Sequence, residues 1–171
     1  MSEIKRRRLE ELDVACHPGT KVGQYVPFYF CARSIMLYLL HRGNHADLAY
    51  RDGQRLIVHL ESDVDEVVDW ARSIDRPWAF SNGNAGTRYT QFYRKIEHLD
   101  RLDWTAIGAT DWRDPIVKER KQTEFLVYES FPWELVKRIG VIDREVANAA
   151  VRAIGIAHHK PDVVVERNWY Y

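Results

Sequence analysis

The chain has 171 residues, a length that fits one domain with a sizeable hydrophobic core. Lys plus Arg and Asp plus Glu each total 25, so the formal net charge is zero and a nucleic-acid partner would need a local basic patch. Two cysteines, Cys16 and Cys31, argue against a disulfide framework and favour a reducing compartment. The charged N-terminus carries no export signal, and the longest apolar run, near residues 35–40, is too short to span a bilayer. We therefore expect a soluble cytoplasmic protein without a membrane partner.

The first half of the chain predicts a short charged helix over residues 3–12 and a loop over 15–24. Residues 25–31 (YVPFYFC) have strand character, and the proline within them indicates a strand start or an edge strand. Ser34 is typical of an N-cap for a helix that Gly43 ends. A strand over 56–60 and an amphipathic helix from Asp63 complete this half.

The second half predicts strands over 78–80, 124–129, 139–142 and 163–166. Residues 81–84 are expected to form a turn and residues 103–115 to be irregular. Helices are predicted over 89–102, 132–138 and 144–154. Because strands and helices mix without regular βαβ alternation, the fold class is predicted to be α+β rather than a doubly wound sheet.

Two features carry chemistry, and each has a simpler alternative. Glu124 begins an apolar strand, so its carboxylate points either into a cleft or to solvent, and alternation alone leaves both open. The basic run over residues 5–8 is either a solvated helix face or the source of an arginine that grips a pyrophosphate.

Other site types find little support in the residues. The histidines do not form a metal set: Gly43 interrupts any helix between His41 and His45, and His158 and His159 are adjacent and point apart. A Ser-His-Asp order, a nucleophile elbow and a glycine-rich phosphate loop do not occur. A metal-dependent nuclease is disfavoured because an acidic cluster followed by E-x-K does not occur.

Several blocks, in order, resemble one family. YVPFYF and RSIMLY over residues 25–38 resemble the DarT signature VPFYF…RSPMLY. WAFSNGNA over residues 78–85, then LDW and WRDP, continue the resemblance. KQTEFLV over residues 121–127 resembles the family's KQAEFLV. The resemblance extends from about residue 4 to the end of the chain.

The resemblance implies an ADP-ribosyltransferase-like split β-sheet with flanking helices, spanning residues 1–171 as a single domain. DarT enzymes are toxins of toxin–antitoxin pairs that transfer ADP-ribose from NAD to a base, often thymidine, in single-stranded DNA without a metal. The resemblance therefore implies NAD as the substrate that supplies ADP-ribose. It also implies two partners, single-stranded DNA and a DarG-type macrodomain antitoxin.

Residue by residue, Glu124 matches the family's catalytic glutamate and Arg8 its essential arginine, with Arg7 as the neighbouring alternative. Arg8 and Arg7 are the expected NAD-binding residues, together with Tyr25. The aromatic residues Tyr25, Phe28 and Tyr29 either wall the cleft or belong to the hydrophobic core. Asn84 stands where some relatives have a histidine that helps to read the base. The expected DNA-binding residues are Asn84, Arg88 and Lys121, and the neighbouring basic residues Arg94, Lys118 and Arg120 flank the same region.

The chain departs from the family pattern at three places. Ile35 replaces the usual proline and Thr123 the usual alanine. The third departure is that nothing before residue 4 supplies the Y-H-x-T motif on the family's first strand and helix, which holds nicotinamide and its ribose. A truncated gene product, a misplaced start codon and a degenerate copy each fit this pattern. The alternative function is a catalytically inactive remnant that binds DNA or the antitoxin without using NAD.

Overall fold

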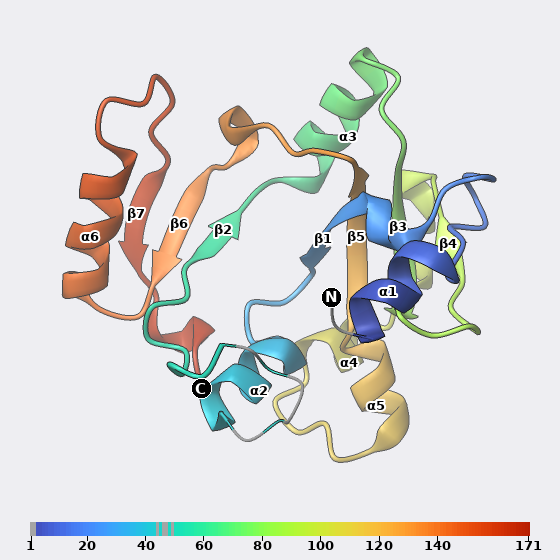
Figure 1. Cartoon of the computed structure of the whole chain (residues 1–171), viewed down its shortest axis with the longest axis horizontal. Coiled ribbons are helices and arrows are strands. Elements are labelled where there is room, and N and C mark those ends of the chain that lie inside the picture. The colour runs from blue at the N-terminus through green and yellow to red at the C-terminus, as the bar shows by residue number, and fades with distance from the viewer. Residues whose placement is uncertain (1–2, 44, 46–47, 49) are drawn as a thin grey trace. The chain divides into compact units, whose positions relative to one another are not determined.

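The computed structural model describes residues 3–43, 45, 48 and 50–171. The chain groups into two compact units: Met1–Cys31 with Val68–Phe131, and Ala32–Val67 with Pro132–Tyr171. Each unit combines helices with a sheet (Figure 1), which confirms the α+β fold class. The expectation of a single domain stays a prediction.

The first unit is built around a four-stranded antiparallel sheet with the order β1-β5-β3-β4. Its strands are β1 (Tyr25–Tyr29), β3 (Trp78–Asn84), β4 (Phe92–Tyr93) and β5 (Thr123–Tyr128). Its helices are α1 (Glu3–Glu10), α4 (Trp104–Gly108) and α5 (Pro115–Arg120), with 3₁₀ turns η1 (Val22–Gln24) and η2 (Ile96–Arg101).

Strand β5 is buried on both faces because apolar groups cover each side of the sheet. Side chains alternate along a strand, so Glu124, Leu126 and Tyr128 share one face and Phe125 lies on the other. On the other face, the Phe125 ring stacks on Trp78 with centroids 5.7 Å apart. The cluster on the first face consists of Leu12, Val14, Val22, Tyr25, Ala79, Ala85 and Leu126.

The register of β3 against β5 shifts beside Glu124. Phe80 pairs with Phe125 and Asn84 with Thr123, so the three residues 81–83 face the single residue Glu124. The Ser81 hydroxyl accepts the Glu124 backbone N–H at 2.9 Å, and Ser81 donates to the Gly83 carbonyl at 2.6 Å. The bulge thus replaces a lost ladder bond with a side-chain bond and fixes the backbone of Glu124.

Helix α1 packs closely against η1 because position 23 is glycine. A Cβ at Gly23 would lie 2.7 Å from Leu9 Cγ and 2.9 Å from Leu9 Cα, which leaves no room for a side chain. This close approach seats the helix that carries the predicted arginines on the first unit.

The second unit contains a three-stranded sheet with the order β2-β6-β7. Its strands are β2 (His59–Glu61), β6 (Arg138–Val141) and β7 (Asp162–Val165), and its helices are α2 (Ile35–Arg42) and α6 (Arg144–Ile154). Strands β6 and β7 are parallel, and α6 connects them and packs against both (Figure 1). The 3₁₀ turns η3 (Trp133–Leu135) and η4 (Arg167–Trp169) also belong here, while α3 (Val64–Ser73) runs from this unit into the first.

Both ends of α2 have the caps that the sequence predicted. The Ser34 hydroxyl accepts the Leu37 N–H at 3.1 Å, and Gly43 ends α2 with φ 60°. Both predictions are confirmed, since a hydroxyl satisfies a free helix N–H and glycine tolerates the left-handed conformation.

The predicted helix over residues 89–102 is wrong. Strand β4 and the turn η2 occupy this segment, because residues 92–93 pair with β3 instead of continuing a helical stripe. Residues 81–84 belong to β3 rather than to a turn, and the strand expected from residue 56 begins at His59. The supposedly irregular segment 103–115 contains α4 and the start of α5, which Asp103 and Asp114 cap.

A histidine in the second unit predicts a pH-dependent stability. The His59 ring lies 4.7 Å from the ring of Tyr170 and 5.6 Å from that of Trp169, and its Nε2 is buried without a hydrogen-bond partner among the described residues. Burial lowers the pKa of His59 below its ordinary value of 6.5. The unfolded chain therefore binds a proton at His59 more readily than the folded protein does. The contribution of His59 to the free energy of unfolding is fully present above pH 6.5 and is lost as the pH drops below 6.5.

We expect the melting temperature to fall between pH 7.5 and pH 5, and His59→Phe to reduce this fall. Thermal melting across that range measures the effect. His158→Phe, at an exposed position, is the matched control and should keep the wild-type slope. An unchanged slope in His59→Phe would show that other groups set the pH dependence.

Candidate functional site

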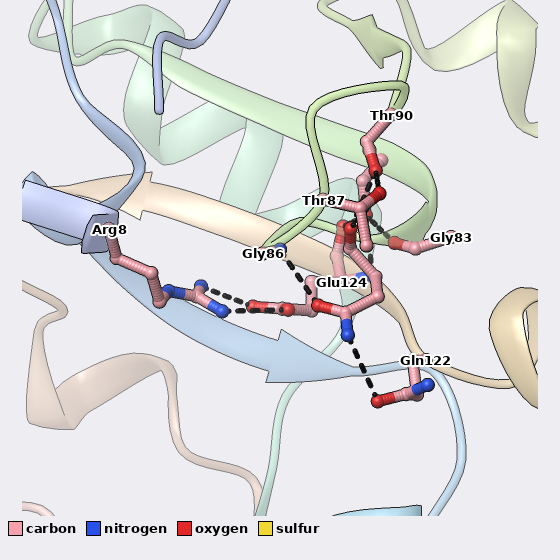
Figure 2. A network of polar contacts seen from close by, with 9 residues as sticks. Arg8, Gly83, Gly86, Thr87, Thr90, Gln122 and Glu124 are labelled. Carbon is pink, nitrogen blue, oxygen red and sulfur yellow. Dashed lines mark hydrogen bonds and ion pairs between the residues drawn. The ribbon is translucent and has the colours of Figure 1, made fainter. Parts of the chain in front are cut away.

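An arginine and a glutamate form the centre of the candidate site. Arg8 on α1 donates from Nη1 to Glu124 Oε1 at 3.1 Å and from Nη2 to Oε2 at 2.7 Å (Figure 2). The Glu124 side chain is 3% exposed and that of Arg8 is 20% exposed. The two-pronged contact matches the planar guanidinium to both carboxylate oxygens, so it fixes orientation as well as charge.

The electrostatics of the pair keep Arg8 charged. Burial opposes the charge, but the hydrogen bond and the negative charge of Glu124 together raise the pKa of Arg8. Arg8 therefore remains a cation in this partly buried setting.

Tyr29 completes the immediate surroundings of Glu124. It pairs with Glu124 across β1 and β5, so both side chains lie on the same face of the sheet. Desolvation, followed by the charge of Glu124, raises the pKa of Tyr29 to about 12, while Arg8 acts in the opposite direction. The hydroxyl therefore stays protonated near neutral pH and can donate a hydrogen bond.

Of the two alternative arginines, Arg8 is the one that contacts Glu124. The Arg7 guanidinium instead donates from Nη2 to the Gly86 carbonyl. Both lie on α1, so the structure brings both predicted arginines to the neighbourhood of residues 84–86 and Glu124.

Asn84 lies at the end of β3, and its amide bonds within the protein. Its Nδ2 donates to Gln122 Oε1 at 3.2 Å, and its Oδ1 accepts the Gly86 N–H at 2.7 Å. These bonds give Asn84 a structural role in shaping the loop that follows β3.

Two other predicted residues lie away from an open surface. Tyr25 is 5% exposed in the hydrophobic cluster, its hydroxyl lies 2.9 Å from Thr20 Oγ1, and its ring meets Tyr128 edge-on. It is four residues from Tyr29 along β1, roughly 13 Å, so it lies outside the immediate surroundings of Glu124, and its role in binding NAD stays a prediction. Lys121 is 3% exposed and donates to the Ile107 carbonyl at 2.9 Å, so its amine is turned inward.

Arg88 is the predicted DNA residue that faces solvent. Its side chain is 76% exposed and lies 3.6 Å from Glu11, a contact that contributes little at the surface. Tyr89 next to it is 95% exposed. The tip of the loop between β3 and β4 therefore presents a cation and an aromatic ring.

The site also contains residues that the sequence pattern did not indicate. Ser81 holds the Glu124 backbone, and Glu119 and Gln122 bond Asn84. Tyr29 was one of the three aromatic candidates for the cleft wall, and it is the one that pairs with Glu124 across the strands. The role of Ser81 depends on a bulge, which alternation of apolar residues does not reveal.

The described part of the chain contains neither a group of three or more His, Cys, Asp and Glu residues that could hold a metal ion nor a helix long and apolar enough to cross a membrane. The arrangement of Arg8 and Glu124 offers a carboxylate and a guanidinium as its chemical groups. A preorganised carboxylate can stabilise positive charge that develops in a transition state, and arginines can bind a diphosphate.

Comparison with known proteins agrees with this chemistry. Residues 1–171 match the model of a family described as DarT, an ssDNA thymidine ADP-ribosyltransferase. A DNA ADP-ribosyl transferase from Thermus aquaticus is 45% identical over 157 residues, which cover 90% of this chain and 66% of that relative. Another from Thermus sp. 2.9 is 37% identical, over 99% of this chain and 79% of that relative.

Solved structures are also similar to this chain. Thermus sp. 2.9 DarT in complex with ADP-ribosylated ssDNA has a TM-score of 0.88 and 34% identity, over 97% of this chain and 78% of that one. The same protein in complex with NAD⁺ has a TM-score of 0.82 and 36% identity, over 90% of this chain and 76% of that one. The likeness confirms the ADP-ribosyltransferase-like split sheet that the sequence resemblance implied.

Proposed function

The chain belongs to the DarT family of single-stranded DNA thymidine ADP-ribosyltransferases, and we propose that it transfers ADP-ribose from NAD to a thymidine base, with Glu124 and Arg8 as its catalytic residues. The observation that carries this proposal is the buried Glu124 carboxylate, which accepts hydrogen bonds from Nη1 and Nη2 of the Arg8 guanidinium. Related Thermus sp. 2.9 structures contain NAD⁺ and ADP-ribosylated ssDNA, which supports both substrates.

The reaction breaks the bond between C1″ of the nicotinamide ribose and nicotinamide, and a base nitrogen forms the new bond to C1″. Positive charge develops on the ribose as nicotinamide leaves with the bonding electrons. The Glu124 carboxylate would stabilise this charge and orient the ribose 2″-hydroxyl. The proton of the attacking base nitrogen is lost to Glu124 or to a neighbouring group.

Arg8 would hold the NAD diphosphate or polarise the base, and Arg7 would contribute to binding NAD. In the structure Arg8 bonds Glu124 instead, so binding of NAD must exchange part of this contact for contacts to the substrate. The charge of Arg8 favours this role, since a guanidinium binds phosphate and carboxylate oxygens with the same geometry.

The proposed DNA contacts centre on the loop between β3 and β4. Arg88 is exposed there and would meet a DNA phosphate, while Tyr89 offers a ring on which a base can stack. Asn84 and Lys121 use their polar atoms within the protein, so we assign them to the support of this region.

The proposed context is that of a cytoplasmic toxin whose antitoxin partner is a DarG-type macrodomain protein that removes the modification. This proposal follows from family membership. Coexpression with a macrodomain antitoxin should relieve toxicity and reduce the ADP-ribose content of cellular DNA. Toxicity that persists with unmodified DNA would contradict the toxin assignment.

The proposal predicts two results from one purified sample. Calorimetric titration should show NAD binding, and incubation with a thymidine-containing single-stranded oligonucleotide should add one ADP-ribose mass. A duplex of the same sequence should react much more slowly, because its bases are stacked and paired. An oligonucleotide that binds without NAD binding or transfer would instead identify the inactive remnant.

A further inference from the structure

Residues 85–91 connect β3 to β4, and we call them the β3–β4 loop. Its base is tied to α5 by one carboxylate: Glu119 Oε1 accepts the Asn84 N–H at 3.1 Å and lies 3.5 Å from the Thr87 hydroxyl. Glycine at position 83 leaves room for this carboxylate, since a Cβ there would lie 3.0 Å from Glu119 Oε1.

Asn84, which Glu119 holds, forms hydrogen bonds to three residues of the loop. Its side-chain oxygen accepts the Gly86 N–H at 2.7 Å, and its backbone carbonyl accepts hydroxyls from Thr87 at 3.2 Å and Thr90 at 2.6 Å (Figure 2). The polar atoms of Asn84 thus fold the loop back on itself and fix the direction of the Gly86 carbonyl.

The Gly86 carbonyl is the acceptor for Arg7 on α1. A continuous series of hydrogen bonds therefore leads from Glu119 through Asn84 and Gly86 to Arg7, the neighbour of Arg8. Elsewhere on α1, the close packing of Leu9 on Gly23 limits the movement of the helix. The loop and the packing together restrict how α1 presents Arg8 to Glu124.

We infer that Glu119 is a positioning residue of the transferase, which acts through the β3–β4 loop and Arg7 to hold Arg8 at Glu124. The inference rests on the proposed function for its effect on catalysis, but the mechanical link can be measured without activity. Catalytic groups need near-ideal placement, and a displacement of about 1 Å can lower a rate by roughly a hundredfold.

Amide hydrogen exchange of the full chain tests the link. In Glu119→Ala, exchange should accelerate about fivefold to tenfold at Gly86 and at Glu11, whose N–H bonds the Arg7 carbonyl at 2.9 Å. The amide of Leu126 in β5 should be unchanged, which shows that the sheet remains folded. Glu119→Gln keeps an oxygen that can accept the Asn84 N–H and should restore protection at both positions.

Arg6→Ala is the matched control, because Arg6 lies on the same helix and pairs with Glu10 and Glu11 rather than with the loop. It should leave Gly86 unaffected, whereas Arg7→Ala should accelerate exchange at Gly86. Faster exchange at Gly86 in Glu119→Ala with no change at Glu11 would overturn the inference, since Glu119 would then shape the loop alone. Failure of Glu119→Gln to restore protection would overturn it as well.

Kinetics of the same variants give the second test. Glu119→Ala and Arg7→Ala should each lower kcat about tenfold to a hundredfold, with a smaller effect on the KM for the oligonucleotide. If both act through one path, the double variant should be no slower than the slower single variant, whereas independent effects multiply and contradict the inference. A wild-type chain without transfer would refute the proposed function, and hydrogen exchange would still decide the inference.

Discussion

Glu124→Gln should lower the rate of ADP-ribose transfer by a factor of about 10² to 10³ while the protein stays folded. Glutamine has nearly the same shape and keeps an oxygen for Arg8, but it carries no negative charge to stabilise the developing positive charge on the ribose. Mass spectrometry of the oligonucleotide gives the rate, and thermal melting of the same sample reports on folding.

Glu129→Gln is the control for this experiment. Glu129 follows the same strand and pairs with Arg76 at 2.7 Å, but its side chain is 61% exposed. We expect its transfer rate to remain within about twofold of wild type, as is usual for an exposed ion pair. Transfer by Glu124→Gln at the wild-type rate would remove Glu124 from the mechanism.

Arg8→Met should lower the free energy of unfolding by about 3 kcal/mol, because it leaves the buried Glu124 carboxylate without its cation. This is the lower end of the range for a buried pair, since a fifth of the Arg8 side chain is exposed. Denaturant unfolding measures the change, and transfer activity should fall with it. Arg6→Met, at an exposed position of α1, should change the stability by less than about 0.5 kcal/mol.

The double variant Arg8→Met/Glu124→Leu distinguishes two effects on the free energy of unfolding: that of a buried carboxylate without a cation and that of the ion pair itself. Apolar side chains of similar volume often replace a buried ion pair without loss of stability. We therefore expect the double variant to be more stable than Arg8→Met alone. A double variant that loses the sum of both single effects would show that the carboxylate is not the source of the instability.

Local signals in the sequence predicted much of the fold. The N-cap Ser34, the αL residue Gly43 and the helix from residue 144 to 154 depend on interactions within a few residues, and the structure has all three. The prediction of a helix over residues 89–102 was wrong because a strand pairing and a loop, both set by distant residues, replaced it.

The same distinction applies to the candidate site. Resemblance to a family identified Glu124 and Arg8, 116 residues apart, and the structure joins them directly. Periodicity could not show whether Glu124 faced a cleft or solvent, because both faces of β5 are buried. The sequence offered Tyr25, Phe28 and Tyr29 as candidates for the cleft wall without ranking them, and strand register places Tyr29 opposite Glu124.

The bulge in β3 requires a fixed number of residues between Phe80 and Asn84, in addition to suitable side chains there. Residues 81–83 span the distance that the single residue Glu124 covers on β5. Removing one of them would shift Asn84 out of line with Thr123, and removing Ser81 would also deprive the Glu124 amide of its hydroxyl acceptor. Insertions and deletions here should thus be tolerated far less than substitutions that keep the number of residues between Phe80 and Asn84.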